Sequence, residues 1–362
     1  MITAKSFTCD ELSITNEKLT SIDSLRFYDV RTTPEFRIYG VMNSADGKCF
    51  VRMPEKIAEN VSASVANLNY NPSGGRVRFV TTSSYVAIRK TKEVASKSSI
   101  ASMIAETGFD IYIRKNDKEV FSGVIYPELR NIPDGYDGIV YLPEGEKEIT
   151  LNFPIYSRVE SLYIGLDCTS SLTRRTDYKY ENPILYYGSS ITQGAYASRP
   201  GMTYEAMISR MLDANYIALG FGGSAKGEDA IIEYLSTLDC SVFVLDYDHN
   251  APTPEHLADT HEKLYMRFRE THPDTPVIMI TKPNIYIPNY GRENDIKRRE
   301  IIFDNYTRAK QRGENVIFID GYSLFESDMR ADCTVDLVHP NDLGMKCIAD
   351  GVGKAVECAL TM

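Results

Sequence analysis

The chain has 362 residues, of which 43% are hydrophobic and 25% are charged, and its formal net charge at pH 7 is -10. This length exceeds that of one typical domain, and no apolar run approaches the roughly 18 residues of a membrane span. A negative charge disfavours nucleic acids and anionic membranes, which bind clustered Lys and Arg, so we expect a small, neutral partner.

The N-terminal sequence and the cysteines bear on the cellular compartment. The stretch MITAKSFTCDELSITNEKL lacks the basic start and the apolar core of a secretion signal. The seven cysteines are scattered and contain no C-x-x-C pair, a pattern more typical of reduced thiols than of a disulfide framework or a zinc site. We therefore expect a cytoplasmic protein.

Apolar and polar residues alternate over much of the first half of the chain. A period of two predicts half-buried strands. The segment NDKE at 116–119 lies between two of them and predicts a hairpin turn, whereas 54–71 fits either a helix or a loop. We expect residues 1–175 to form an antiparallel, jelly-roll-like β-sandwich, with strands at 76–80, 85–89, 109–114, 119–126, 148–153 and 161–167.

The pattern changes after a polar stretch at 169–183, which is the best candidate for a linker. Apolar runs at 184–187, 216–219, 242–246, 277–280 and 316–320 alternate with helical patterns near 203–213, 226–238, 254–271, 293–312 and 342–360. Continuous apolar strands that alternate with helices predict a parallel sheet covered on both faces. We expect residues 176–362 to form a three-layer α/β/α domain, with its ligand beyond the carboxyl ends of the strands.

Four of the predicted strands lead into segments that carry chemistry. These segments are GSSIT at 188–192, GFGGS at 220–224, DYDHNA at 246–251 and DLVHP at 336–340. Together they offer a serine, backbone N–H groups, a carboxamide, and a histidine with an acid three residues before it. Acyl transfer requires these groups as nucleophile, oxyanion donors, base and orienting acid.

Each segment also has an ordinary structural explanation. The glycine-rich segments can be tight turns, and Asn250 can cap the following helix. His339 is harder to explain in this way, because Pro340 keeps it out of the helical region and displays it just before a helix capped by Asn341 or Asp342. The remaining histidines are expected at the surface or at the edge of the core: His249, His256, His261 and His272.

The GSSIT, Gly223, Asn250 and DLVH segments together resemble the SGNH superfamily of GDSL-like esterases and lipases, whose catalytic domain has a flavodoxin-like α/β/α fold. The family pattern G-x-S places Ser190 at the nucleophile position and Ser189 where an aspartate is common. Spacing alone does not choose between these two serines. The β-rich half adds a second resemblance, because GFDIY at 108–112 is similar to the G-x-D-L-Y signature of a domain that precedes the catalytic domain in one branch of the superfamily.

The resemblance implies a role for each residue of the site. His339 would be the base and Asp336 the acid that orients it. The oxyanion hole would consist of the backbone N–H groups of Ser190 and Gly223 and the side chain of Asn250. The third family block is commonly G-x-N-D, whereas this chain has DHNA at 248–251, so the presentation of Asn250 departs from the pattern.

Two other protein classes were compared with this interpretation, α/β-hydrolases and dinucleotide-binding proteins. The nucleophile elbow of α/β-hydrolases requires G-x-S-x-G, and Thr192 at the last position excludes it. Gly220, Gly222 and Ala225 satisfy the dinucleotide-binding pattern G-x-G-x-x-G/A, with Asp246 as a candidate ribose-binding acid. That alternative leaves the serine, asparagine and histidine segments without a role.

The sequence therefore predicts a serine esterase, a carboxylic ester hydrolase that removes a short acyl group, O-acetyl in our interpretation, from a carbohydrate or oligosaccharide. The predicted reaction requires no metal or organic cofactor. An acyltransferase with the same acyl-enzyme and a non-catalytic glycan-binding protein are the alternatives. The segment 283–295 is rich in Tyr and Asn and can be either a sugar contact or a solvated connection, and a free sheet edge permits a homo-oligomer. The candidate substrate contacts are Tyr196, Arg199 and Tyr286.

Overall fold

The computed structural model describes residues 2, 4–91, 94–95, 101–128, 131–132, 134–283, 292–326 and 328–361. The chain divides into two compact units. Unit 1 comprises Met1–Arg52, Tyr70–Asp177 and Ser198–Gly201, and unit 2 comprises Met53–Asn69, Tyr178–Ala197 and Met202–Met362. The short segment Ser198–Gly201 therefore packs with unit 1, although it follows the first strand of unit 2 in the sequence.

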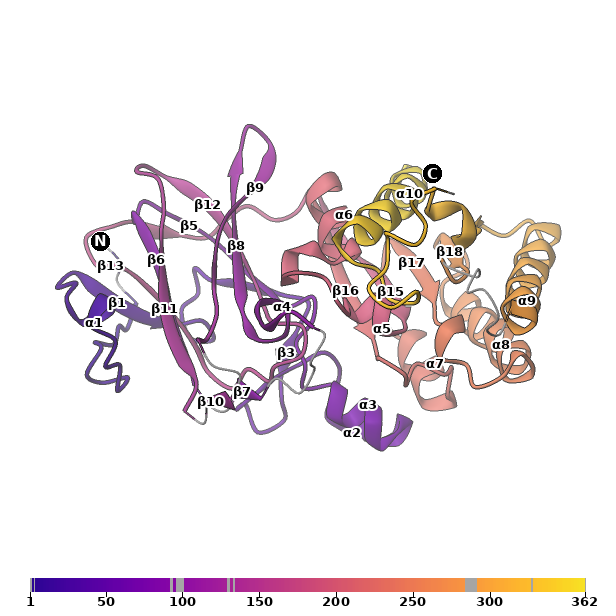
Figure 1. Ribbon diagram of the computed structural model, residues 1–362, viewed down its shortest axis with the longest axis horizontal. Coiled ribbons are helices and arrows are strands. Elements are labelled where there is room, and N and C mark those ends of the chain that lie inside the picture. The colour runs from indigo at the N-terminus through magenta and orange to yellow at the C-terminus, as the bar shows by residue number, and fades with distance from the viewer. Residues whose placement is uncertain are drawn as a thin grey trace. The chain divides into compact units, whose positions relative to one another are not determined.

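Unit 1 is a sandwich of two antiparallel sheets (Figure 1). One sheet has the order β1-β13-β6-β11 and the other β14-β5-β12-β8-β9, with β2 also paired to β5. Inward-facing residues of both sheets, such as Ile88 and Ile149, form one buried apolar cluster, so the predicted antiparallel sandwich is confirmed. The elements of unit 1 are α1 (Glu17–Thr20), β1 (Leu25–Asp29), β2 (Arg37–Tyr39), β3 (Met42–Asn43), β4 (Phe50–Val51), β5 (Arg76–Thr81), β6 (Tyr85–Lys90), β7 (Val94–Ala95), α4 (Met103–Thr107), β8 (Phe109–Lys115), β9 (Lys118–Ile125), β10 (Asn131–Ile132), β11 (Tyr136–Tyr141), β12 (Lys147–Asn152), β13 (Leu162–Asp167) and β14 (Leu172–Thr173).

Two features of β8 follow from its sequence. Asn116 and Asp117 have φ angles of 50° and 60°, and both residues tolerate the left-handed region that a two-residue hairpin turn between β8 and β9 requires. Asp110 is fully buried, and its carboxylate accepts hydrogen bonds of 2.8 Å from Asn152 Nδ2 and from the Gly201 N–H. The aspartate of the GFDIY segment therefore holds the segment Ser198–Gly201 within unit 1.

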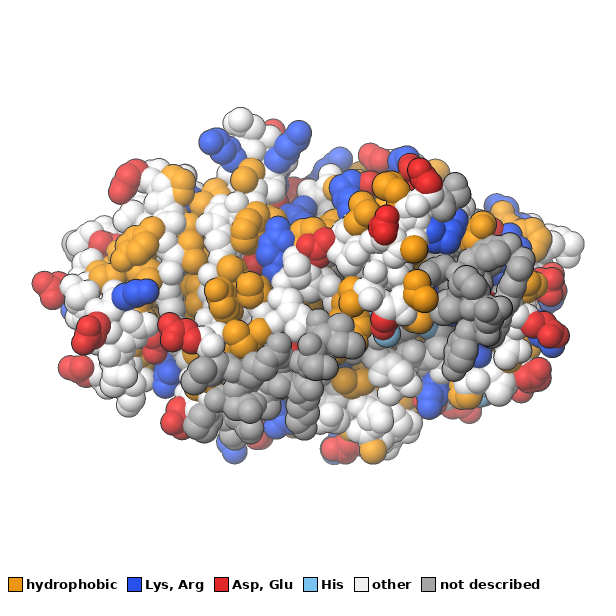
Figure 2. Space-filling view, in the orientation of Figure 1, with side chains coloured by type: hydrophobic (Ala, Val, Ile, Leu, Met, Phe, Trp, Pro, Cys, Tyr) orange, Lys and Arg blue, Asp and Glu red, His pale blue; other side chains and the backbone are white. Residues whose placement is uncertain are grey.

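Apolar side chains gather on one face of unit 1, over strands β9 and β11 (Figure 2). Val120, Phe121 and Tyr141 are exposed on these strands, and Tyr126 follows β9. The guanidinium of Arg199 lies 4.1 Å from the centre of the Phe121 ring and covers part of that side chain. Exposed apolar residues are common on folded proteins, and this cluster by itself assigns no partner.

Unit 2 contains a five-stranded parallel sheet with the order β16-β15-β17-β18-β19 (Figure 1). The strands are β15 (Tyr180–Gly188), β16 (Ala214–Gly220), β17 (Val242–Asp246), β18 (Val277–Ile280) and β19 (Val316–Ile319). The helices are α2 (Glu55–Val61), α3 (Ala63–Leu68), α5 (Ser190–Gln193), α6 (Tyr204–Leu212), α7 (Asp229–Leu235), α8 (Pro254–Thr271), α9 (Arg292–Gln311) and α10 (Asp342–Leu360), with short 3-10 turns η2 (Asp248–Asn250) and η3 (Gly321–Leu324). The 3-10 turn η1 (Pro200–Met202) begins in the segment Ser198–Gly201 of unit 1. The first strand lies between the second and the third, which is the flavodoxin-like order with its switch point beside β15.

Helices cover both faces of this sheet. Leu185 and Tyr187 of β15 pack into a cluster with residues of α7, α8 and α9, whereas the intervening Tyr186 packs edge-to-face against Tyr204 of α6. Helix α10 packs against α6 on that second face. The predicted α/β/α architecture is confirmed, and the segment left open at 54–71 contains the two helices α2 and α3.

Two of the histidines, His249 and His261, are less exposed than expected, whereas His256 and His272 are half-buried, as expected for the edge of the core. His261 of α8 is 1% exposed, and its Nδ1 lies 2.9 Å from Asn305 Nδ2 of α9. The side chain of His249 is 7% exposed. A buried neutral imidazole is stable because its ring can pack as an apolar group while one nitrogen is hydrogen-bonded. Among the described residues, no helix has the length and apolar character needed to cross a membrane.

Candidate active site

The two serines after β15 have different environments. Ser189 is fully buried and caps α5, and its hydroxyl accepts the Ile191 N–H at 3.2 Å. The Ser189 N–H donates to the Asp246 carbonyl at the end of β17, at 3.1 Å. Ser190 is the first helical residue and lines a pocket. The chain therefore uses one hydroxyl to start the helix and displays the other.

Glycines allow the turns after β15 and β16 to interlock. A Cβ at Gly220 would lie 2.1 Å from the Gln193 backbone nitrogen, so only glycine fits there. The Gln193 side chain in turn accepts the Gly222 N–H at 2.8 Å. This contact fixes the GFGGS turn beside Ser190.

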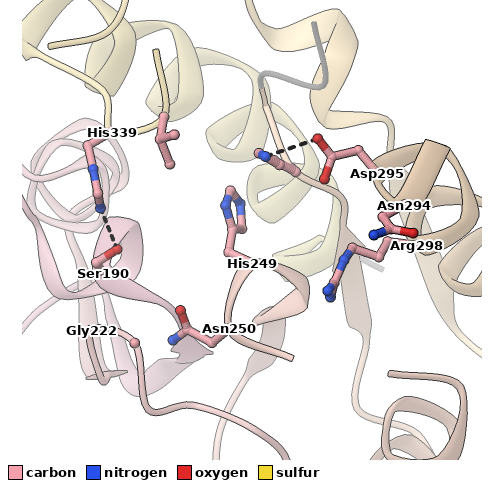
Figure 3. A pocket seen from close by; sticks show the side chains of 11 residues that line it. Ser190, Gly222, His249, Asn250, Asn294, Asp295, Arg298 and His339 are labelled. Atoms are coloured by element: carbon pink, nitrogen blue, oxygen red, sulfur yellow. Dashed lines mark hydrogen bonds and ion pairs between the residues drawn. The ribbon is translucent and has the colours of Figure 1, made fainter. Parts of the chain in front are cut away.

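Ser190, His339 and Asp336 form a chain of hydrogen bonds. Ser190 Oγ lies 2.9 Å from His339 Nε2, and His339 Nδ1 lies 2.8 Å from Asp336 Oδ2. Figure 3 shows the serine and histidine side chains pointing toward each other. A serine hydroxyl beside an imidazole that a carboxylate orients can transfer its proton to the ring and become a nucleophile.

The loop that carries His339 is held by its own acid. Burial alone would raise the pKa of Asp336, but hydrogen bonds from the backbone and side chain of His339 and from the Val338 N–H outweigh it and hold this pKa below its usual value. Leu337, inside the loop, has a φ of 69°. Tyr196 packs edge-to-face on the His339 ring, with 4.9 Å between the ring centres. These contacts orient the imidazole toward Ser190.

The three candidate oxyanion donors lie along the same pocket. Asn250 Nδ2 donates one N–H to the Phe221 carbonyl at 2.9 Å, which fixes the amide and leaves a second N–H on the same nitrogen. Gly223 has a φ of 69°, in the left-handed region that glycine tolerates. Within the described part of the chain, the backbone N–H groups of Ser190 and Gly223 donate to no protein acceptor. All three groups can therefore donate to a developing negative charge.

The far wall of the pocket is polar. The cavity has a volume of about 540 Å³, within the range of roughly 300–1,000 Å³ found for small-molecule sites. Figure 3 shows Ser190 and His339 on one side, Asn294, Asp295 and Arg298 on the other, and His249 and Asn250 between them. Besides the nucleophile, the base and the oxyanion donors, the described residues that line the pocket are Gly222, His249, Lys282, Asn294, Asp295, Arg298 and Val338.

A buried group of ionisable residues supports this wall from behind. Burial raises the pKa of Asp248 to about 6, although the Lys282 N–H donates to its Oδ2 at 2.9 Å. Burial, together with the positive charge of Lys282, lowers the pKa of His249 to about 3, so its ring is neutral at pH 7. Atoms of Asp246, Asp248 and His249 lie within 4.8 Å of one another and could hold a metal ion. The neighbouring positive charges of Lys282 and Arg298 oppose a bound cation.

The structure places the other sequence candidates as follows. Tyr196 contacts the His339 ring, as described above. Arg199 is held in unit 1, with its Nε 3.7 Å from Asp110 Oδ2. Tyr286 lies outside the described residues. Sequence reasoning missed His249, which we expected at the surface or core edge; its position beside Asn250, directly after a buried strand, was the available signal.

The candidate ribose-binding acid of the dinucleotide alternative is also buried. Asp246 Oδ2 accepts the Thr192 hydroxyl at 3.1 Å and the Tyr204 hydroxyl at 3.4 Å. Burial raises its pKa well above the usual value. A carboxyl group enclosed by these hydroxyls is not presented to a ribose, and Gly220 is needed for packing against Gln193. The geometry therefore disfavours a dinucleotide site.

Comparisons with known proteins cover most of the chain. Residues 181–357 match the model of the GDSL-like Lipase/Acylhydrolase family, and residues 25–172 match a model described as the N-terminus of Esterase_SGNH_hydro-type. No curated protein matches the sequence.

Solved structures resemble the chain over nearly its full length. A protein described as a GDSL-like lipase from Bacteroides ovatus ATCC 8483 is 28% identical with a TM-score of 0.83, over 93% of this chain and 98% of that one. A salicylyl-acyltransferase from a tetracycline biosynthetic pathway is 18% identical with a TM-score of 0.74, over the same two shares. An acetyl xylan esterase from Butyrivibrio proteoclasticus is 13% identical with a TM-score of 0.57, over 92% of this chain and 99% of that one. The last two similarities establish the fold.

Proposed function

The chain belongs to the GDSL-like lipase/acylhydrolase family with a GxDLY N-terminal domain, and from this premise we propose that it is a serine esterase that removes a short acyl group, acetyl, from a carbohydrate oxygen. The observation that carries the proposal is the hydrogen-bonded chain from Ser190 through His339 to Asp336, with distances of 2.9 Å and 2.8 Å. No other nucleophile and base are needed for ester cleavage by this route.

In the proposed reaction, His339 Nε2 takes the proton of Ser190 as its Oγ attacks the ester carbonyl. The tetrahedral intermediate collapses, and the bond between the acyl carbon and the sugar oxygen breaks. The protonated His339 gives its proton to the departing sugar alkoxide. A water molecule, deprotonated by His339, then attacks the acyl-enzyme and releases the acid together with free Ser190. Asp336 stabilises the imidazolium in both steps, because its carboxylate accepts a hydrogen bond from the Nδ1–H group of His339.

The oxyanion of each tetrahedral intermediate would be held by Ser190 N–H, Gly223 N–H and Asn250 Nδ2. These donors come from three different strand ends, and the contacts of Gln193 and Phe221 fix two of them before substrate binds. Donors that are already oriented stabilise developing charge without reorganisation at the moment of reaction.

Two observations support a carbohydrate as the substrate. The described pocket wall is mostly polar, which suits an alcohol rich in hydroxyl groups better than a lipid chain. An acetyl xylan esterase is among the proteins that share the fold. Transfer to an alcohol instead of water is the second candidate, because the same fold occurs in a salicylyl-acyltransferase at a TM-score of 0.74. Both reactions would pass through one acyl-enzyme.

The experiment that tests the proposal compares wild type, Ser190→Ala and Ser189→Ala, each checked for folding by circular dichroism. Wild type and Ser189→Ala should hydrolyse p-nitrophenyl acetate and be labelled by a fluorophosphonate at Ser190, located by peptide mass spectrometry. Ser190→Ala should lose at least about 10³-fold in kcat and the label. Ser189→Ala should lose only about 1 kcal/mol of stability with its helix cap. Equal activity in all three proteins would refute the proposal.

The same assay separates hydrolysis from transfer. Added glycerol or a methyl glycoside competes with water for the acyl-enzyme, so a transferase would form the new ester faster than it releases acetate. An esterase would release acetate at a rate that these alcohols hardly change. Mass spectrometry of the products distinguishes the two outcomes.

A further inference from the structure

The pocket wall opposite Ser190 combines hydrogen-bond donors and acceptors. Lys282 Nζ lies 3.1 Å from Asp295 Oδ2, and the two side chains are only 14% and 12% exposed. Arg298 donates to the Asp248 backbone carbonyl at 2.7 Å and keeps further N–H groups on its guanidinium. Asn294 adds an amide that both donates and accepts. Val338 is the one apolar side chain among the described residues that line this pocket.

His249 stands between this wall and the nucleophile (Figure 3). Its Nε2 lies 3.5 Å from Asp248 Oδ1, inside the protein, and has no hydrogen-bond partner among the described residues. A proton on Nε2 faces the carboxylate, and Nδ1 of the neutral ring is then a hydrogen-bond acceptor. Nδ1, unlike Nε2, is not among the buried unpaired atoms of the described residues, so the pocket can present it to a ligand.

The charges of this region balance. Lys282 and Arg298 contribute two positive charges, and Asp295 and the ionised form of Asp248 contribute two negative charges. The whole chain carries a net charge of -10, which offers no long-range attraction for an anion. A ligand that both donates and accepts hydrogen bonds and carries no charge fits this wall better than a carboxylate or phosphate does.

We infer that His249, Lys282, Asn294, Asp295 and Arg298 form a hydroxyl-binding subsite for the alcohol part of the ester, a neutral sugar or related polyol. Neighbouring hydroxyl groups can each donate to one member of the wall and accept from another, which the adjacent Lys282 and Asp295 groups offer in one place. His249 Nδ1 would accept a hydrogen bond from the hydroxyl group nearest the ester. This inference rests on the proposed function, because it places the leaving alcohol in the pocket that holds Ser190.

The test compares His249→Phe and Lys282→Met with wild type on two acetyl esters. One substrate is an acetylated methyl xyloside, and the other is p-nitrophenyl acetate, whose leaving group has no hydroxyl to bind. The readout is the ratio of kcat/KM for the sugar ester to that for the aryl ester. We expect the ratio to fall roughly 3- to 10-fold in His249→Phe and roughly 10- to 100-fold in Lys282→Met, mainly through KM for the sugar ester.

Lys297→Met is the matched control. Lys297 also pairs with a carboxylate at 3.1 Å, that of Glu293, but it is 50% exposed and does not line the pocket. The ratio should stay at the wild-type value in this variant. Fluorophosphonate labelling of Ser190 in every variant checks that the nucleophile is intact, so a misfolded protein cannot be mistaken for a loss of sugar binding.

Three results would overturn the inference. One is an unchanged ratio in both pocket variants when labelling and p-nitrophenyl acetate hydrolysis are intact, which would leave the proposed esterase standing. Another is a preference of the wild type for an acetylated methyl glucuronoside over the neutral glycoside, which would make the subsite an anion site. The third is that wild type neither hydrolyses any of the esters nor is labelled at Ser190, which would refute the proposed function as well.

Discussion

The side-chain nitrogen of Asn250 carries two N–H groups with different roles. One N–H is bound to the Phe221 carbonyl at 2.9 Å, and the other remains for an oxyanion. We predict that Asn250→Ala lowers kcat on p-nitrophenyl acetate by roughly 10²- to 10³-fold, about 3 kcal/mol of transition-state stabilisation, with a smaller change in KM. Steady-state kinetics measures this effect.

The variant Asn250→Asp is the control for shape. It keeps the size of the side chain but supplies no N–H, and its carboxylate would repel the oxyanion, so its kcat should fall at least as far. Full activity of either folded variant would show that the third donor lies elsewhere, as the departure of DHNA from the common family block allows.

At the scale of single residues, the sequence pattern predicted the kinds of catalytic group. It did not by itself show which of the two serines is the nucleophile, or which further residues line the pocket. Ser189 and Ser190 have the same side chain, and the structure distinguishes them: Ser189 caps the Ile191 N–H, whereas Ser190 contacts His339. His249 was missed because its burial depends on segments far apart in the chain, those that carry Lys282 and Arg298. Such long-range packing has no local pattern.

At the scale of elements, two glycines of one turn should respond differently to the same change. A Cβ at Gly220 would lie 2.1 Å from the Gln193 backbone nitrogen, whereas one at Gly222 would lie 3.3 Å from the Gln193 Oε1 atom. We predict that Gly220→Ala lowers the free energy of unfolding by about 3 kcal/mol or more, because the backbone of α5 must move. Gly222→Ala should cost less than about 1 kcal/mol, because a side-chain end can shift.

Urea unfolding of the two variants beside wild type measures the difference. Equal losses would contradict the prediction, since they would mean that the turn after β16 does not need to pack against the turn after β15. Activity is not the readout here, because Gly222 lines the pocket and an added methyl group there would crowd Ser190.

Most elements were predictable because their patterns are local. The period-two pattern in Phe109–Lys115 and the continuous apolar run in Val242–Asp246 are both local signals of a strand, although the first strand is buried on its second face as well, at Asp110 and Tyr112. The segment at 54–71 was ambiguous for the opposite reason. Helices α2 and α3 are only 7 and 6 residues long, too short for a helical period to be distinct, and their packing within unit 2 stabilises them.

At the scale of the whole molecule, buried ionisable groups link stability to pH in both directions. Burial lowers the pKa of His261 to about 3, and it raises the pKa of Glu205 well above its usual value. As pH falls below 6.5, the unfolded chain takes up a proton at His261 and the folded chain does not, so this residue makes the protein less stable in acid. The buried glutamic acid has the opposite sign, because its folded form keeps a proton that the unfolded chain loses as pH rises.

The contribution of Glu205 is the same in wild type and in His261→Gln, so it cancels when the two proteins are compared. The difference between them then reports the contribution of His261 alone. The variant keeps an amide oxygen for the Asn305 Nδ2 group, at 2.9 Å from the histidine in wild type, but removes the proton uptake of the unfolded chain. Between pH 7 and pH 5, wild type should lose about 2 kcal/mol more of its free energy of unfolding than the variant, at about 1.4 kcal/mol per pH unit below 6.5. Urea unfolding at both pH values measures this difference whatever the stability of the variant at pH 7. Parallel pH dependences in the two proteins would mean that His261 already takes up its proton in the folded state, and that its burial between α8 and α9 is not maintained in acid.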